Sequence, residues 1–80
     1  MARKVFEYYE AVTAMIPTQG GYQAAIAVKS LEGGGAPRFH AVLPGQLFKT
    51  ADDADQAASD ELERLLDVDA DADLVWRQVS

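Results

Sequence analysis

Residues 22–30 alternate between apolar and polar or small side chains in the way a half-buried strand does. One face of this segment would carry four inward side chains: Tyr22, Ala24, Ile26 and Val28. A two-residue period is the signature of a strand with one face on the core. Residues 38–43 alternate similarly, and the expected inner face there holds Phe39, Ala41 and Leu43. We therefore predict two strands joined by the glycine-rich residues 31–37.

Residues 5–16 fit two periods. With a period of two, one face collects Phe6, Tyr8, Val12, Ala14 and Ile16. With a period of 3.6, a helical stripe collects Val5, Tyr8, Tyr9, Val12, Met15 and Ile16. The aromatic and β-branched content favours a strand that ends at Pro17 and a short turn at Thr18–Gly21. The helix remains the alternative.

A helix is predicted over residues 51–66. Thr50 is placed to cap the amide of Asp53, and acidic residues fill the first turn, where the helix dipole favours them. An apolar stripe at helical spacing follows: Ala54, Ala57, Ala58, Leu62, Leu65 and Leu66. Beyond an acidic connector, residues 74–79 could form a short fourth, edge strand or a helical turn that packs Trp76 on the domain.

These elements predict an α+β fold: a three-stranded antiparallel sheet covered on one face by a single helix, in the order β-β-β-α, with a short fourth strand as an option. Eighty residues suit one domain. We expect it to span residues 1–80, with the core at about 5–67 and the connector and terminal segment at 68–80. The chain has no cysteine, which excludes disulfides and favours a cytoplasmic protein. Neither a secretory signal nor a membrane span is expected.

A resemblance rests on specific residues. Phe48-x-Thr50-x-Asp52-Asp53-Ala54, then Ala58 and the run Leu65-Leu66-Asp67, resembles a group of small uncharacterised bacterial βββα domains. Gly21-Tyr22 is similar to their glycine-aromatic opening of the second strand, whereas the helix end lacks their aromatic residue. The resemblance implies the topology of a double-stranded-RNA-binding domain without its first helix, and it implies no known activity.

Charge is divided unevenly along the chain. Residues 51–80 carry ten acidic and two basic side chains, whereas residues 1–50 carry three acidic and five basic ones. Double-stranded-RNA-binding domains place lysines at the start of the helix after the third strand. This chain has Asp52, Asp53 and Asp55 there. Because these carboxylates would repel phosphates, nucleic-acid binding is not expected.

Four aspartates spaced two apart follow the predicted helix: Asp67, Asp69, Asp71 and Asp73. They match the beginning of a calcium-binding loop, whose ligands are oxygens. Ala72 stands where that loop needs glycine, and Gln78 stands where it needs a bidentate glutamate. A solvated acidic connector is the simpler interpretation, and a divalent-ion site is the alternative.

No catalytic constellation is evident. His40 is the only histidine, and it has neither a cysteine for a zinc site nor a recognisable acid–base partner. The serines lack the sequence context of a nucleophile. We therefore predict a non-enzymatic domain without a cofactor.

The remaining candidate surface is the sheet face that the helix leaves open. The expected strand registers place seven residues on it: Tyr9, Ala11, Thr13, Ala25, Ala27, His40 and Val42. Trp76 either joins this surface or folds over it. An exposed, weakly polar sheet face is typical of an interface. The sequence thus predicts a protein-interaction module whose partner is another protein or a second copy of the chain, with small-ligand or ion binding as the alternative function.

Overall fold

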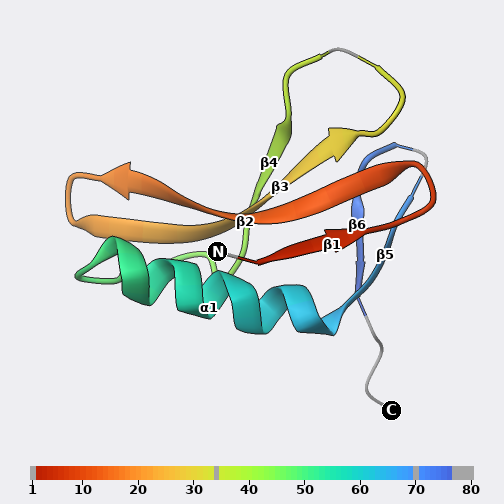
Figure 1. Cartoon of the computed structure of the whole chain (residues 1–80). Helices are drawn as coiled ribbons and strands as arrows, with labels where there is room; N and C mark the ends of the chain where they lie inside the picture. Colours follow the sequence, from red (N-terminus) through yellow and green to blue (C-terminus); the bar gives the residue numbers. More distant parts are fainter. Residues whose placement is uncertain (1, 34, 70, 77–80) are drawn as a thin grey trace.

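The chain folds as one four-stranded antiparallel sheet, one helix and a second, two-stranded sheet. The computed structural model describes residues 2–33, 35–69 and 71–76. The large sheet runs in the order β1 (Arg3–Val5), β2 (Tyr9–Thr18), β3 (Gly21–Ser30) and β4 (Arg38–Ala41). Helix α1 (Ala51–Arg64) lies along one face of it, and β5 (Leu65–Val68) pairs with β6 (Leu74–Trp76) beside it (Figure 1). The predicted α+β class is confirmed.

The β2–β3 hairpin is the longest strand pairing in the fold. Ten residue pairs join the two strands, from Tyr9 opposite Ser30 to Thr18 opposite Gly21. Residues 9–16 of the ambiguous segment are therefore a strand, which excludes the helical alternative, and residues 6–8 connect β1 to β2. β1 adds to the outer edge of β2 through three pairs, a strand that the sequence did not predict.

Helix α1 begins where its cap predicts. The hydroxyl of Thr50 accepts a hydrogen bond of 3.1 Å from the amide of Asp53, and Asp52 and Asp53 lie in the first turn. Ala54, Ala58 and Leu62 form its buried face. The helix ends at Arg64, two residues before the predicted end, because Leu65 takes an extended conformation and opens β5. Leu65 is buried in the core, but Leu66 points outward and is 56% exposed.

The helix covers a different face of β2 and β4 from the one we expected. Ala11 pairs with Val28 and Thr13 with Ile26, so all four share one face. Both Ala11 and Thr13 are buried, and Thr13 contacts α1 through Asp55. The assignment of these two residues to the open face is therefore wrong. The inward face of β3 is as predicted.

The fourth predicted strand exists but belongs elsewhere. Residues 74–76 form β6, which pairs antiparallel with β5 rather than adding to an edge of the large sheet. Residues 77–79 of that prediction lie outside the described residues. The β5–β6 hairpin packs on the same side of the large sheet as α1. Val68 is part of the hydrophobic core, and Ala72 and Leu74 pack against that core. This position leaves the opposite face of the large sheet without a second layer from the described residues.

Candidate interaction face and acidic hairpin loop

The face of the large sheet opposite α1 is built from small and apolar side chains. Strand alternation and the pairing registers give this open face three charged residues, Arg3, Glu10 and Lys29, and the following apolar ones: Val5 on β1, Val12, Ala14 and Ile16 on β2, Ala25 and Ala27 on β3, and Phe39 and Ala41 on β4. Its central row crosses three strands as Ala14, Ala25 and Ala41. The neighbouring row, Val12, Ala27 and Phe39, forms a taller ridge beside it.

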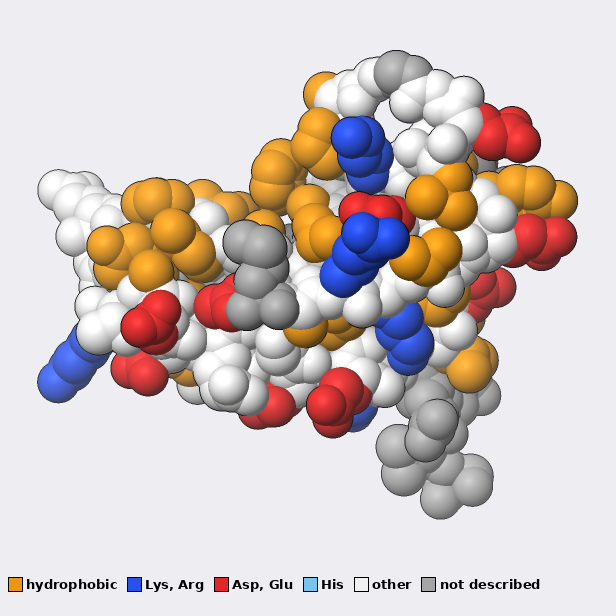
Figure 2. Space-filling view, in the orientation of Figure 1, with side chains coloured by type: hydrophobic (Ala, Val, Ile, Leu, Met, Phe, Trp, Pro, Cys, Tyr) orange, Lys and Arg blue, Asp and Glu red, His pale blue; other side chains and the backbone are white. Residues whose placement is uncertain are grey.

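Two large apolar side chains of the open face are in contact with solvent. Phe39 is 57% exposed and Val5 is 53% exposed. Figure 2 shows hydrophobic side chains gathered over the β2–β3 hairpin on the side away from α1. Ala25 and Ala27 belong to the same face, although their surroundings shield them from solvent. The face therefore combines exposed anchors with a low, close-packed centre.

Charged groups lie only along one end of the open face. Arg3 and Glu10 form an ion pair at 3.3 Å, and Lys29 stands opposite Glu10 in the sheet register. In contrast, the acidic residues of α1 and the β5–β6 hairpin lie on the other side of the sheet. The open face thus carries little of the chain's negative charge.

Five residues that the sequence placed on the open face lie on the helix side instead. Ala11, Thr13 and Val42 are buried there. Tyr9 packs against the same core, and His40 contacts the β5–β6 loop. Trp76, which was expected to join or cover the open face, lies in β6 opposite Leu65. Ala25 and Ala27 are the expected residues that the structure does place on the open face.

The aspartate series after the helix forms the loop of the β5–β6 hairpin. Carboxylate oxygens of Asp69, Asp71 and Asp73 lie within 4.8 Å of one another, and all three residues are exposed. The fourth predicted ligand, Asp67, lies in β5 outside this group, and its carboxylate accepts the amide of Val68 at 2.8 Å. The structure therefore gathers three of the four carboxylates.

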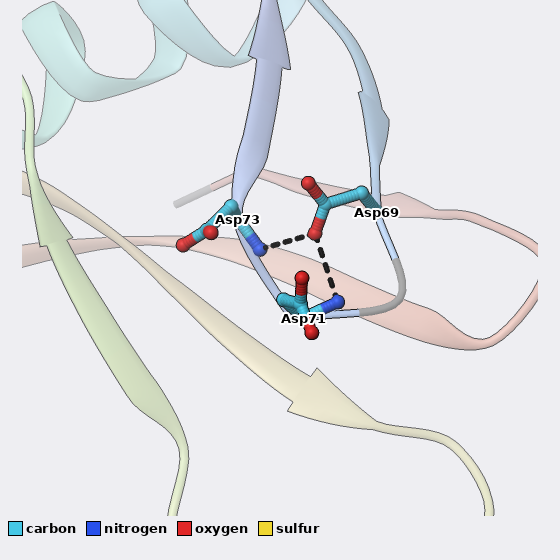
Figure 3. A group of neighbouring side chains, drawn as sticks. All are labelled: Asp69, Asp71 and Asp73. Carbon is cyan, nitrogen blue, oxygen red and sulfur yellow. Dashed lines mark hydrogen bonds between the residues drawn. The ribbon is translucent and has the colours of Figure 1, made fainter.

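Hydrogen bonds within the loop account for the position of Asp69. One carboxylate oxygen of Asp69 accepts the amide of Asp71 at 2.9 Å and the amide of Asp73 at 3.0 Å (Figure 3). Such side-chain bonds to the backbone two and four residues on are typical of aspartate in turns. Ala72 adopts a left-handed backbone with φ of 64°, at the position where a calcium loop would require glycine. The Asp69 carboxylate thus has a structural role in the turn.

Strand β4 holds the same loop from the other side. A ring nitrogen of His40 lies 2.8 Å from the carbonyl oxygen of Ala72, and the Arg38 guanidinium donates to the carbonyl of Asp71 at 3.1 Å. Arg38 also lies 3.8 Å from a carboxylate oxygen of Asp73. The single histidine therefore fastens the hairpin to the sheet.

The part of the chain that the structure describes holds two candidate chemical groups, His40 and the aspartates of the hairpin loop. His40 is engaged with a backbone carbonyl, and the aspartate group of the hairpin is the one cluster of three or more metal-ligating side chains in those residues. The described helix is too short and too polar to cross a membrane. No family model, curated protein or solved structure matches this chain.

Proposed function

We propose that this chain is a non-catalytic protein-interaction domain whose partner packs on the open face. One observation carries the proposal: a sheet with a helix on one face exposes Phe39 and Val5 on the other. A sheet buries an apolar face against a second layer, and the described residues supply none here. A contiguous exposed apolar surface is a common mark of a protein interface.

The composition of the open face supports a protein partner over other ligands. A large aromatic side chain beside a low alanine row gives a ridge and a shallow depression, which a second apolar surface can fill closely. The cations of the face are Arg3, which is paired with Glu10, and Lys29, so the face offers phosphates little positive charge. Asp52 and Asp53 in the first turn of α1 add repulsion on the helix side. The partner is another protein or a second copy of this chain.

The experiment that tests this proposal compares Phe39→Lys with Leu66→Lys. Both side chains are more than half exposed in the free chain, at 57% and 56%, but Leu66 lies on β5 of the second sheet. The wild-type chain is used to capture partners from a cell lysate after nuclease treatment, and its sedimentation is measured to detect self-association. Phe39→Lys should abolish the association, whereas Leu66→Lys should retain it. Equal association by both variants would overturn the proposal.

Binding of a divalent ion by the hairpin loop is the second candidate function. The three converging carboxylates favour it. However, Asp69 is already occupied by two backbone amides and Asp73 lies near Arg38. We therefore rank it below protein interaction.

A further inference from the structure

The open face is centred on the β2–β3 hairpin. The strand order β1-β2-β3-β4 places one short strand outside each of the two long ones. A twofold axis that runs along the strands between β2 and β3 would lay a second copy of this face over the first. In such a pair, β2 of one copy covers β3 of the other, and β1 covers β4. Sheets pack face to face in this way with their strands within about 30° of each other.

One row of side chains across the open face is complementary to itself under this symmetry. From β1 to β4, the row consists of Arg3, Val12, Ala27 and Phe39. The axis reverses the row in the second copy, so valine meets alanine at the centre. At each end, the Arg3 guanidinium of one copy meets the exposed Phe39 ring of the other. Large side chains over small ones pack closely, and a guanidinium over an aromatic ring is a favourable contact.

The neighbouring row carries charges and is complementary to itself in the same way. Glu10 on β2 stands opposite Lys29 on β3. The axis therefore places the Glu10 carboxylate of one copy over the Lys29 ammonium of the other, twice in each pair. These long side chains can span the small displacement that the angle between the two sheets introduces. The ion pair of 3.3 Å between Glu10 and Arg3 within each chain is kept.

The charges select this axis over the other twofold arrangement of the two faces. An axis perpendicular to the strands, through the middle of the hairpin, would also overlay the faces. It would cover Glu10 with Ile16 of the other copy. Lys29 would meet Gln23, so neither of these charges would face an opposite charge across the interface. Removing charges from water without such partners is unfavourable.

We propose that the partner of the open face is a second copy of this chain, in a symmetric dimer with β2 of each copy over β3 of the other. This inference rests on the proposed function, because it names the partner of the same face. Helix α1 lies on the far side of each sheet (Figure 1), so its acidic side chains point away from the interface. The dimer would have four layers, in the order helix, sheet, sheet and helix, with both faces of each sheet covered.

The size of the open face predicts a reversible dimer. Strands β2 and β3 have ten residues each, whereas β1 has three and β4 has four. At a strand spacing of about 4.8 Å and a rise of about 3.3 Å per residue, the face of one copy covers roughly 400–500 Å². The two copies together would bury about 1,000 Å², which is the lower limit for a specific interface. We therefore expect a dissociation constant on the order of 100 µM.

The test mixes two charge variants of the whole chain, Glu10→Lys and Lys29→Glu. In a symmetric dimer of either variant, like charges face each other at two places, which should weaken self-association by at least about ten-fold. In a mixed pair, opposite charges face each other again at both places. The mixture should therefore associate at least as tightly as the wild-type chain. Repulsion within each chain cannot produce this result, because each variant keeps its own like charges in the mixture.

The readout is a titration of the ¹⁵N-labelled Glu10→Lys chain with the unlabelled Lys29→Glu chain. Saturable amide shifts are expected at four residues of the open face: Val12, Ala14, Ala25 and Ala27. Unlabelled Glu10→Lys at the same concentrations should cause much smaller shifts, and Phe39→Lys added to both chains should abolish them. Glu63→Lys makes the same charge change at an exposed position of α1 and should dimerise as the wild-type chain does.

Sedimentation of the wild-type chain provides a second, independent decision. A chain that stays monomeric up to about 1 mM would overturn the inference, as would a mixture that associates no better than either variant alone. A wild-type dimer that persists unchanged in Phe39→Lys would lie on another surface and would also overturn it. The proposed function can survive these results, because a different protein captured by the wild-type chain and lost with Phe39→Lys would still use the open face.

Discussion

The hydroxyl of Thr13 on β2 donates to a carboxylate oxygen of Asp55 on α1, with 2.8 Å between the two oxygens. The same hydroxyl accepts the amide of Ala2, which precedes β1, at 2.9 Å. Thr13 is 4% exposed and is the buried polar side chain of the described core. One side chain therefore joins the edge strand, the central hairpin and the helix.

Replacing Thr13 by valine should destabilise the fold through these bonds. Valine keeps the shape and the strand preference, but it leaves the Ala2 amide and the Asp55 carboxylate without this partner. The loss should be about 1–3 kcal/mol, because two part-buried hydrogen bonds are removed and one of them is made to a carboxylate. Urea unfolding measures it. Thr18→Val is the control, because Thr18 is exposed, and should change stability by no more than about 0.5 kcal/mol. Equal losses in both variants would contradict the role of Thr13.

Gly21 and Phe48 are held together by a close backbone approach. Tyr22 and Phe48 exchange two backbone hydrogen bonds, each 2.8 Å long. A Cβ built on Gly21 would lie 2.6 Å from the carbonyl oxygen of Phe48, and Gly21 has a φ of 146°. Gly21→Ala should therefore cost about 1–3 kcal/mol, because both the conformation and the contact exclude a side chain.

The control for Gly21→Ala is Gly33→Ala. A Cβ at Gly33 would meet no atom within 4 Å. Its stability should stay within about 0.5 kcal/mol of wild type. Thermal or urea unfolding of the two variants tests whether the contact between Gly21 and Phe48, rather than the loss of glycine in general, limits stability.

Asp69 should matter for the hairpin through hydrogen bonding rather than metal binding. Asp69→Ala removes the acceptor of two backbone amides and should cost about 1–2 kcal/mol. Asp69→Asn keeps an acceptor oxygen and should cost less. Calcium should raise the melting temperature no more than sodium chloride of equal ionic strength does. A larger rise with calcium that Asp71→Asn abolishes would favour the ion-binding alternative.

His40 should control how firmly the β5–β6 loop is held. His40→Phe removes the contact to the carbonyl of Ala72 and should weaken the docking of the loop by about 1 kcal/mol. Amide hydrogen exchange at Asp71 and Asp73 should then become about five-fold faster. The amides of β2 and β3 are the internal control and should keep their rates. Unchanged exchange at Asp71 would contradict this role of His40.

Much of the fold could be predicted from local patterns. The cap at Thr50, the turn before Gly21 and the alternation in β3 each depend on neighbouring residues. The face of β2 that packs against the core could not be predicted locally, because both faces of this strand are largely apolar. The helix brings Ala54 and Ala58 against the sheet, and this close packing accommodates the small Ala11 and Thr13 and leaves Val12 and Ile16 outside. The prediction took the bulkier face of β2 as the one that faces the core, and this assignment was wrong.

The same limitation explains the errors in β4 and at the end of the helix. Phe39 is more hydrophobic than His40, but the carbonyl of Ala72 gives His40 a hydrogen bond on the inner side. Leu65 continues the helical stripe in sequence, yet it pairs with Trp76 eleven residues later. β1 has only three residues, which is too few for a period to be detected. Each outcome depends on contacts between distant segments.

The most direct test of the central claim is photo-crosslinking in living cells with benzoyl-phenylalanine at position 39. The same probe at position 66 is the matched control, since Phe39 and Leu66 are similarly exposed but lie on different sheets. We predict a discrete protein adduct from position 39, either with another protein or with a second copy of the chain, and none of that mass from position 66. The same adducts from both positions, or none from position 39, would contradict an interface on the open face.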